Sequence, residues 1–279
     1  MNRSELSSWL RDGGPRPLLM GVLNVTPDSF SDGGRFVSPE AAARRVDEMV
    51  CEGADWIDVG GESTRPGSRP VSAGEQIERV LPAIRAAVER DVVVSIDTTL
   101  SAVAEAALDA GASIVNDISA GRDDPSMLKL VSERAAAVVL MHMQGTPATM
   151  QIEPRYVDVV GEVLDFLAER RDAALRSGIA RERILLDPGI GFGKTTEHNL
   201  RLMRELRRFR ELGQPLLVGT SRKRFIGEVT DRPDPSERLL GTAATVSWAI
   251  ANGAAVVRVH DVSEMRQVLR MTEAMMPRR

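Results

Sequence analysis

The chain has 279 residues, of which 43% are hydrophobic and 27% are charged, a balance typical of a globular protein with a sizeable core. The formal net charge of −4 excludes the strongly basic surface that non-specific nucleic-acid binding needs. No run reaches the roughly 18 apolar residues of a membrane span, and the single cysteine, Cys51, allows no internal disulfide, so we expect a cytoplasmic protein without nucleic-acid or membrane partners.

Residues 1–16 are mostly polar and end in a Gly-Gly-Pro stretch, so we expect a short N-terminal extension ahead of one catalytic domain over 17–279. In that domain, short apolar runs alternate with amphipathic segments. The runs span 18–25, 56–61, 92–98, 113–119, 137–143, 183–189, 215–221 and 256–260. Runs that are apolar throughout predict strands buried on both faces, and their alternation with helices predicts a parallel sheet.

The amphipathic segments predict the helices between the strands. They include 38–54, 72–90, 100–111, 154–177 and 236–252. Ser38, Ser72 and Ser263 are residues of the type that caps helix starts. We interpret Cys51 as a small packing residue of the first of these helices rather than as a nucleophile.

Eight strand–helix units in roughly 250 residues predict an α/β protein of the closed (β/α)8, or TIM, barrel type in a single domain. A doubly wound open sheet is the alternative. Such a sheet usually has fewer strands and a glycine-rich turn after the first strand, and "LNVTPDSF" (23–30) has no such turn.

Polar or charged side chains stand at the end of every predicted strand. They are Asn24; Glu62, Ser63 and Thr64; Asp97; Asn116 and Asp117; His142; Asp187; Ser221, Arg222 and Lys223; and Arg258 with His260. Burying a polar group costs free energy unless it is paired, so polar groups at all eight ends are hard to explain as structural anchors. In a barrel these ends share the face that carries catalysis. The sequence therefore predicts one site at that face.

The residue types divide this site into two halves. Acceptor groups suit a flat heterocycle edged with N–H and C=O groups, and they come from Asp97, Asn116 and Asp187. Positive charge and N–H donors suit a phosphate-bearing ligand, and they come from Lys223, Arg258 and His260. A helix beginning soon after Ser221 would add its dipole to the anion site.

Structural alternatives remain for several of these residues. Asp187 could cap the loop that follows it, and Asp97 could cap the next helix. Arg258 could pair with Asp97 inside the barrel. His142 fits a residue that supports the site without touching the ligand, and His198 fits a surface position at a helix start.

The sequence has no cluster of Cys and His residues, so we do not expect a zinc site. A magnesium ion held by phosphate oxygens and one protein oxygen, such as that of Asn24, needs no such cluster.

The segment "GIGFGKT" (189–195) suggests a phosphate-binding P-loop, but Pro188 occupies the position where that motif requires glycine. We expect its glycines to turn the backbone sharply or to let it approach a ligand. Phe192, between two of them, could cover a flat ring.

Two loops at the predicted catalytic face carry side chains that could complete the site. "TPDSFSDGG" (26–34) contains Phe30 and Asp32, and "STRPGSRP" (63–70) follows the second strand. We interpret both as lids that exclude water when they close. The alternative is that both are ordinary solvated barrel loops.

Eight motifs in order along the chain resemble those of the bacterial dihydropteroate synthase family. They are "MGVLNVTPDSFSDGG", "DVGGESTRPGS", "SIDT", "NDIS", "LMHMQGTP", "LLDPGIGFGK", "GTSRKRFIG" and "RVHDV", and the resemblance runs from about residue 17 to about residue 273. The resemblance implies a (β/α)8 barrel, typically homodimeric, that condenses 6-hydroxymethyl-7,8-dihydropterin diphosphate with para-aminobenzoate. The products are dihydropteroate and pyrophosphate in folate synthesis, and sulfonamides compete at the aminobenzoate site.

The resemblance also implies residue roles. The implied pterin diphosphate site comprises Thr64, Asp97, Asn116, Met141, Asp187, Phe192, Lys223, Arg258 and His260. The implied aminobenzoate site comprises Phe30, Thr64, Pro66, Ser221 and Lys223. The implied catalytic residues are Asp32, Phe30, Lys223, Arg258 and His260, with Asn24 as the Mg²⁺ ligand. Asp32 would stabilise the cation left when pyrophosphate departs. Arg224 follows Lys223 where some members have serine, which leaves open what meets the aminobenzoate carboxylate.

Two other functions are compatible with part of the pattern. A methyltransferase that uses methyltetrahydrofolate and a corrinoid partner shares the barrel and part of the pterin-binding set, but it does not need the Arg258–His260 pair. A non-catalytic paralogue that binds pterin or acts as a scaffold is the second alternative, and the intact loop motifs argue against it.

Overall fold

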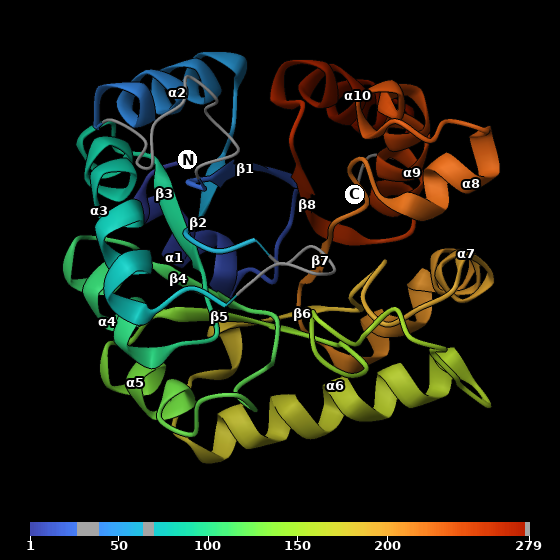
Figure 1. Cartoon of the computed structure of the whole chain (residues 1–279), viewed down its shortest axis with the longest axis horizontal. Coiled ribbons are helices and arrows are strands. Elements are labelled where there is room, and N and C mark those ends of the chain that lie inside the picture. Colours follow the sequence, from blue (N-terminus) through green and yellow to red (C-terminus); the bar gives the residue numbers. More distant parts are fainter. Residues whose placement is uncertain (27–38, 64–69, 277–279) are drawn as a thin grey trace.

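The computed structural model in Figure 1 describes residues 1–26, 39–63 and 70–276. Eight parallel strands form a closed barrel in which each strand pairs with the next along the chain and the last pairs with the first. The strands are β1 (Leu18–Asn24), β2 (Trp56–Gly60), β3 (Val93–Asp97), β4 (Ile114–Asp117), β5 (Ala137–Met141), β6 (Ile184–Asp187), β7 (Leu216–Val218) and β8 (Ala254–Val259). The predicted (β/α)8 barrel is confirmed.

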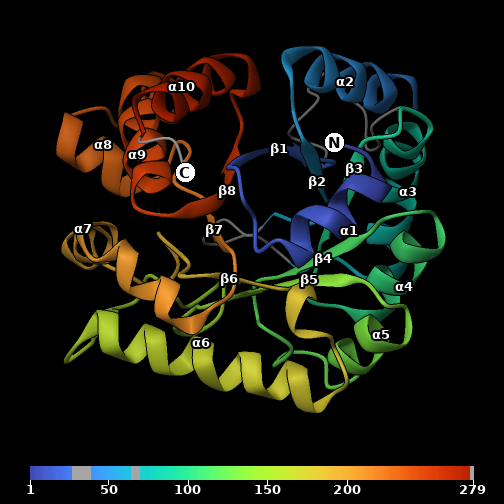
Figure 2. The same cartoon turned by 180° about the vertical axis from the view of Figure 1, so that it is seen from behind.

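Helices surround the barrel on its outside in both views (Figures 1 and 2). The α-helices are α1 (Arg3–Arg11), α2 (Pro39–Glu52), α3 (Ala73–Glu89), α4 (Ser101–Asp109), α5 (Met127–Glu133), α6 (Val159–Arg176), α7 (Thr196–Arg204), α8 (Arg224–Thr230), α9 (Leu239–Ala251) and α10 (Val262–Met275). Short 3₁₀ turns are η2 (Arg181–Arg183), η3 (Leu206–Leu212) and η4 (Pro235–Glu237). No helix in the described ranges has both the length and the apolar character needed to cross a bilayer.

Strand alternation divides the buried residues into two apolar clusters. Outward-facing residues such as Leu19 and Ile57 pack under the helices, whereas inward-facing residues such as Leu18 and Trp56 fill the barrel near the amino ends of the strands. Further along the same inward-facing rows the residues become polar. The barrel therefore has an apolar floor, formed where its strands begin, and a polar rim, formed where they end.

The amino-terminal segment is part of the floor rather than the polar extension expected from the sequence. In α1, Leu6, Trp9 and Leu10 are buried, and the ring of Trp9 stands edge-on to that of Trp56 with centroids 5.3 Å apart. The backbone N–H of Val93 donates to the carbonyl of Met1 at 3.2 Å. Helix α1 thus closes the amino-terminal end of the barrel (Figure 2).

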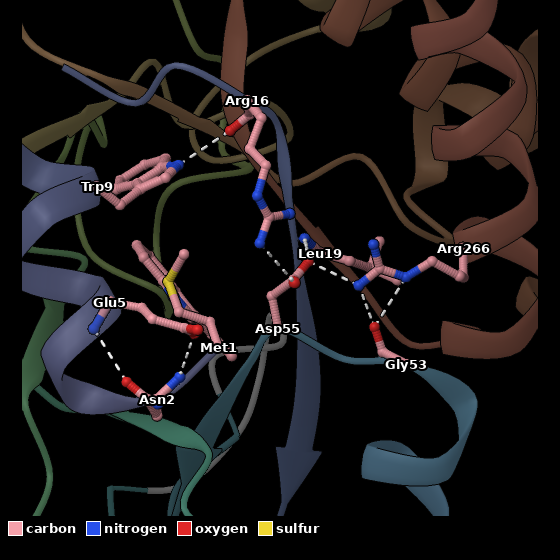
Figure 3. A network of polar contacts seen from close by, with 10 residues as sticks. Met1, Asn2, Glu5, Trp9, Arg16, Leu19, Gly53, Asp55 and Arg266 are labelled. Carbon is pink, nitrogen blue, oxygen red and sulfur yellow. Dashed lines mark hydrogen bonds and ion pairs between the residues drawn. The ribbon is translucent and has the colours of Figure 1, made fainter. Parts of the chain in front are cut away.

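Asp55, just before β2, links the floor of the barrel to α10 and to the segment after α1 (Figure 3). Asp55 Oδ2 accepts the backbone N–H of Leu19 at 2.9 Å and a guanidinium N–H of Arg266, from α10, at 2.6 Å. Arg16 lies 3.6 Å from the other carboxylate oxygen. Arg266 also donates to the carbonyl of Gly53 at 2.8 Å. This network joins the start of two strands to α10 and to the segment after α1.

The expected helix starts meet different outcomes. Ser72 caps α3 by accepting the backbone N–H of Glu75 at 3.3 Å, as predicted. The prediction for Ser263 is wrong, because α10 begins at Val262 and Ser263 lies inside it. Ser38 lies outside the described residues. The packing role expected for Cys51 is also wrong, since Cys51 is exposed on α2.

Candidate active site

The strand register places the predicted site residues at one level of the barrel. Asn24 is paired in register with Gly60, Gly60 with Asp97, and Asp97 with Asn116, so one row crosses β1 to β4. On the opposite side, Met141 of β5 is paired with Asp187 of β6. Side chains that are far apart in the sequence therefore meet at the rim.

A cluster of charged side chains joins this row to Asp58 of β2 and Arg258 of β8. Arg258 donates from Nη2 to Asp97 at 2.7 Å and from Nε to Asp58 at 2.6 Å. The same oxygen of Asp58 accepts a hydrogen bond from Nδ2 of Asn116 at 3.0 Å. The pairing of Arg258 with Asp97, considered as an alternative from the sequence, is what the structure shows. Both residues nevertheless remain at the rim of the barrel.

The carboxyl group of Asp97 responds to this environment. Burial raises its pKa, and the nearby Asp58 carboxylate raises it further, while Arg258 opposes both effects. Asp97 is therefore held by its guanidinium partner, and removing that positive charge would favour the protonated acid. Asn24 reaches the same neighbourhood, because its side-chain oxygen and Asp97 both lie close to Gly60.

Asp187 and Lys223 lie in the other half of the rim, where each influences the charge of the other. Asp187 accepts the backbone N–H of Gly189 at 2.7 Å, so it does cap its loop, as one alternative proposed. Lys223 donates to the carbonyl of Ile190, and its ammonium lies 4.7 Å from the centre of the Phe192 ring. Burial raises the pKa of Asp187, and burial lowers the pKa of Lys223 to about 8. The opposite charges oppose each shift, so the two groups stabilise one another.

The glycines of the 189–195 loop make this arrangement possible. Gly189 and Gly191 have φ of +65° and +86°, a region that favours glycine. A Cβ atom on Gly189 would lie 1.9 Å from the carbonyl oxygen of His142, and one on Gly191 would lie 2.9 Å from Cδ of Lys223. The expectation of a sharply turning backbone is confirmed, and the close neighbour of Gly191 is Lys223.

Lys194, at the end of this loop, was not singled out from the sequence. Its side chain is only 3% exposed, and its ammonium contacts His142 Nδ1 and the carbonyls of Gly189 and Phe192, each at 2.9 Å. Burial, together with Lys194, lowers the pKa of His142 to about 2, so this histidine is neutral at physiological pH. Lys194 is a structural clamp for the loop, and His142 supports it.

The segment after β7 meets the end of β8. Ser221 Oγ lies 3.0 Å from Nδ1 of His260 and accepts the backbone N–H of the same residue at 3.2 Å. Arg222 donates from Nε to Asp261 at 3.0 Å. Helix α8 begins at Arg224, close behind Lys223 as expected. The structure therefore uses Arg222 to tie two rim loops together and leaves Lys223 directed into the site.

Comparisons with known proteins decide among the functions considered. The family model of the pterin binding enzymes matches residues 20–260. The dihydropteroate synthase of Synechocystis sp. is 49% identical over 267 residues, which are 95% of this chain and 92% of that protein. The chain belongs to the dihydropteroate synthase family.

Solved structures of dihydropteroate synthases extend the comparison. The enzyme of Xanthomonas albilineans with 4-aminobenzoic acid has a TM-score of 0.89 and 45% identity, covering 95% of both chains. The same enzyme in complex with 7,8-dihydropteroate has a TM-score of 0.86 and 43% identity, covering 95% of this chain and 96% of that one. The resemblance read from the motifs is confirmed, and this protein is an enzyme of the transferase class.

Some residues that the dihydropteroate synthase resemblance implies lie outside the described residues. They are Phe30, Asp32, Thr64 and Pro66, and their roles stay predictions. Asp117, at the end of β4, has a local structural role, because it accepts the backbone N–H groups of Ser119 and Gly121 at 2.7 Å each. His198 lies in the first turn of α7, where its backbone N–H donates to Thr195, as its expected position at a helix start implied.

Proposed function

We propose that this protein condenses 6-hydroxymethyl-7,8-dihydropterin diphosphate with para-aminobenzoate to give 7,8-dihydropteroate and pyrophosphate. One observation carries the proposal. In a chain of the dihydropteroate synthase family, Asp97, Asn116 and Asp187 stand at the same rim as Lys223 and Arg258. The first three offer acceptors to the N–H groups of a pterin ring, and the two cations suit its diphosphate.

The proposed chemistry is displacement of pyrophosphate from the carbon attached to the pterin ring. The ring can delocalise positive charge, so the bond to oxygen can break before the amine attacks. The site then has to stabilise a cation and a departing anion together. Asp32 is proposed to stabilise the cation, and it lies outside the described residues.

The departing pyrophosphate requires positive charge at the other side of the site. Arg258 has N–H groups beyond those bonded to Asp58 and Asp97, and His260 lies between the end of β8 and the start of α10. The amine of para-aminobenzoate is uncharged, so it needs positioning rather than deprotonation. Ser221 and Lys223 are the described residues proposed to position it.

Magnesium is a proposed cofactor. Among the described residues no group of three or more His, Cys, Asp or Glu side chains could hold a metal ion. An ion held mostly by diphosphate oxygens and water needs only one protein oxygen, and the amide oxygen of Asn24, beside Gly60 at the rim, fits that requirement. When bound, magnesium would neutralise charge on the leaving group.

The proposed assembly is a homodimer. Its support is a set of exposed apolar side chains on the neighbouring helices α9 and α10, namely Trp248, Met271 and Met275. Thr272 of α10 donates to Ser247 of α9 at 2.9 Å, so the two helices present a joint surface. We also propose a cytoplasmic location, which fits a chain with one cysteine.

The test of the proposed function is product formation by the purified protein. Both substrates are mixed with the protein, with and without magnesium, and dihydropteroate and pyrophosphate are quantified. We expect the two products in equal amounts and a strong dependence on magnesium. Binding of the pterin substrate without any product would instead support a non-catalytic paralogue, and transfer of a methyl group from methyltetrahydrofolate would support the methyltransferase alternative.

A further inference from the structure

We infer that Asp58 is a positioning residue that orients both halves of the substrate site, the pterin half through Asn116 and the diphosphate half through Arg258. This inference rests on the proposed function. Asp58 lies in the middle of β2, and its side chain has no exposed surface. It faces into the barrel two residues before Gly60, and so lies deeper than the rim. It therefore does not need to touch the substrate to affect how the substrate binds.

Asp58 fixes the orientation of the side-chain amide of Asn116. An ionised carboxylate can only accept hydrogen bonds, so the group that Asn116 turns toward Asp58 must be its NH₂, at 3.0 Å. The reversed amide would place two oxygens against each other in a buried site. Asp58 thereby commits the oxygen of Asn116 to the ligand side. The pterin half of the site then presents acceptors from Asn116, Asp97 and Asp187, which matches a ring edge rich in N–H donors.

Asp58 also holds the guanidinium of Arg258. Asp58 accepts a hydrogen bond from its Nε and Asp97 accepts one from its Nη2. These two hydrogen bonds hold the planar guanidinium in one orientation. No described residue accepts a hydrogen bond from Nη1. The guanidinium is therefore held rigidly with donors to spare, the arrangement that recognition of a diphosphate oxygen requires.

The bonding of Asp58 argues against a purely structural role. Both of its donors, Asn116 and Arg258, come from residues proposed to bind substrate, and they use the same oxygen. Its other oxygen has no partner among the described protein groups. A buried charge is a weak source of net stability. A carboxylate that served only the fold would satisfy both oxygens with the barrel frame, as Asp55 does with a backbone N–H and two arginines.

The experiment compares three variants with the intact protein. Asp58→Ala removes the acceptor, Asp58→Asn keeps an isosteric acceptor without the charge, and Ser95→Ala is the matched control. Ser95 is paired in register with Asp58 on β3, is equally buried, and its hydroxyl has no described partner. Calorimetry measures the binding of two probes separately, 6-hydroxymethyl-7,8-dihydropterin for the pterin half and inorganic pyrophosphate with magnesium for the other half.

We expect Asp58→Ala to weaken the binding of both probes by roughly 10- to 100-fold, which is the cost of losing a hydrogen bond to a charged group. Asp58→Asn should weaken the binding of pyrophosphate more than the binding of the pterin. The side-chain oxygen of the new asparagine can still orient Asn116, but the charge that holds Arg258 is lost. Ser95→Ala should bind both probes with dissociation constants within about 2-fold of those of the intact protein, since no hydrogen bond is lost.

A double-mutant cycle separates orientation from packing. In an Asn116→Ala background, Asp58→Ala should have little further effect on pterin binding, because the amide that it orients is gone. Equal effects of Asp58→Ala with and without Asn116, or unchanged binding of both probes in folded Asp58→Ala and Asp58→Asn proteins, would overturn the inference. Failure of the intact protein to bind either probe would instead overturn the proposed function.

Discussion

Two aspartates at β2 show how the two ends of one barrel differ. Asp55 stands just before the strand, at the floor, and Asp58 stands inside it, below the rim. Both are buried and both bind an arginine from the end of the chain, Arg266 for Asp55 and Arg258 for Asp58. The floor network joins elements of the frame to one another (Figure 3), whereas the rim network ends on residues proposed to bind substrate.

The role of each ion pair therefore depends on which end of the barrel it occupies. At the floor, Trp9, Trp56 and the rest of the apolar cluster cover the strand starts. At the rim the barrel interior changes to polar groups. Arg258 there keeps donors that no described residue uses, although it is bound to two carboxyl groups. We therefore expect floor changes to affect stability and rim changes to affect activity.

The largest expected effect comes from exchanging each arginine for methionine. Arg258→Met should reduce kcat/KM by roughly 10³-fold, because it removes charge-assisted donors to the leaving group. Arg266→Met should leave kcat/KM within about 2-fold and lower the free energy of unfolding by roughly 2 kcal/mol, because Asp55 and Gly53 lose their shared donor. Steady-state kinetics and urea unfolding measure the two effects, and an equal loss of kcat/KM in both folded variants would remove the distinction.

The second effect isolates the apolar part of the floor. Trp9→Ala should lower the free energy of unfolding by about 3 kcal/mol through loss of buried surface, and the melting temperature by roughly 6–12 °C. The activity of the folded fraction should not change, since the ring lies at the opposite end from the site. A thermal melt paired with kinetics at low temperature measures both, and a fall in kcat at full folding would show that the two ends are coupled.

Two glycines with positive φ, Gly191 at the rim and Gly13 at the floor, allow a third comparison of the two ends. Gly191→Ala should weaken pterin diphosphate binding by roughly 10- to 100-fold, because the new methyl group displaces Lys223. Gly13→Ala is the matched control at the floor. Its φ of +68° imposes similar backbone strain, but nothing lies within 4 Å of the added Cβ. Both variants should lose about 1 kcal/mol of stability, and only the first should change KM. A raised KM in the Gly13 variant would count against this reading of the loop.

The smallest effect is a pH dependence at the rim. Burial lowers the pKa of Lys223 to about 8, and the ammonium is the form that binds an anion. As the pH rises through 8, the cation is lost, so kcat/KM should fall on the alkaline side with a midpoint near that value. Lys223→Arg should shift this decline beyond pH 9 in its residual activity, because a guanidinium stays protonated. A decline at the same pH in both proteins would assign it to another group.

The sequence predicted the frame and the strand-end residues well, because both follow from simple regularities. Apolar runs of strand length, separated by amphipathic segments, marked every strand, and polar residues after those runs marked the rim. The register then placed Asp97 beside Asn116 and Met141 beside Asp187. Which partner each side chain chooses does not follow from the pattern, and the pairing of Arg258 with Asp97 stood only as an alternative.

The residues that were missed lie where the pattern is ambiguous. Asp58 sits inside an apolar run rather than at its end, although its inward parity with Trp56 was a usable signal. Lys194 was hidden by its likeness to a phosphate-binding motif. In α1, the spacing of Leu6, Trp9 and Leu10 is that of one helix face, but the polar residues around them dominated the interpretation.

The most direct test of the account is a crystal structure of the protein with pterin diphosphate and para-aminobenzoate, or with dihydropteroate. We expect the pterin ring at the rim against Asp97, Asn116 and Asp187, with the oxygen of Asn116 accepting a ring N–H and Arg258 facing the diphosphate. A ligand bound elsewhere on the barrel, or an Asn116 amide that donates to the ring, would contradict it.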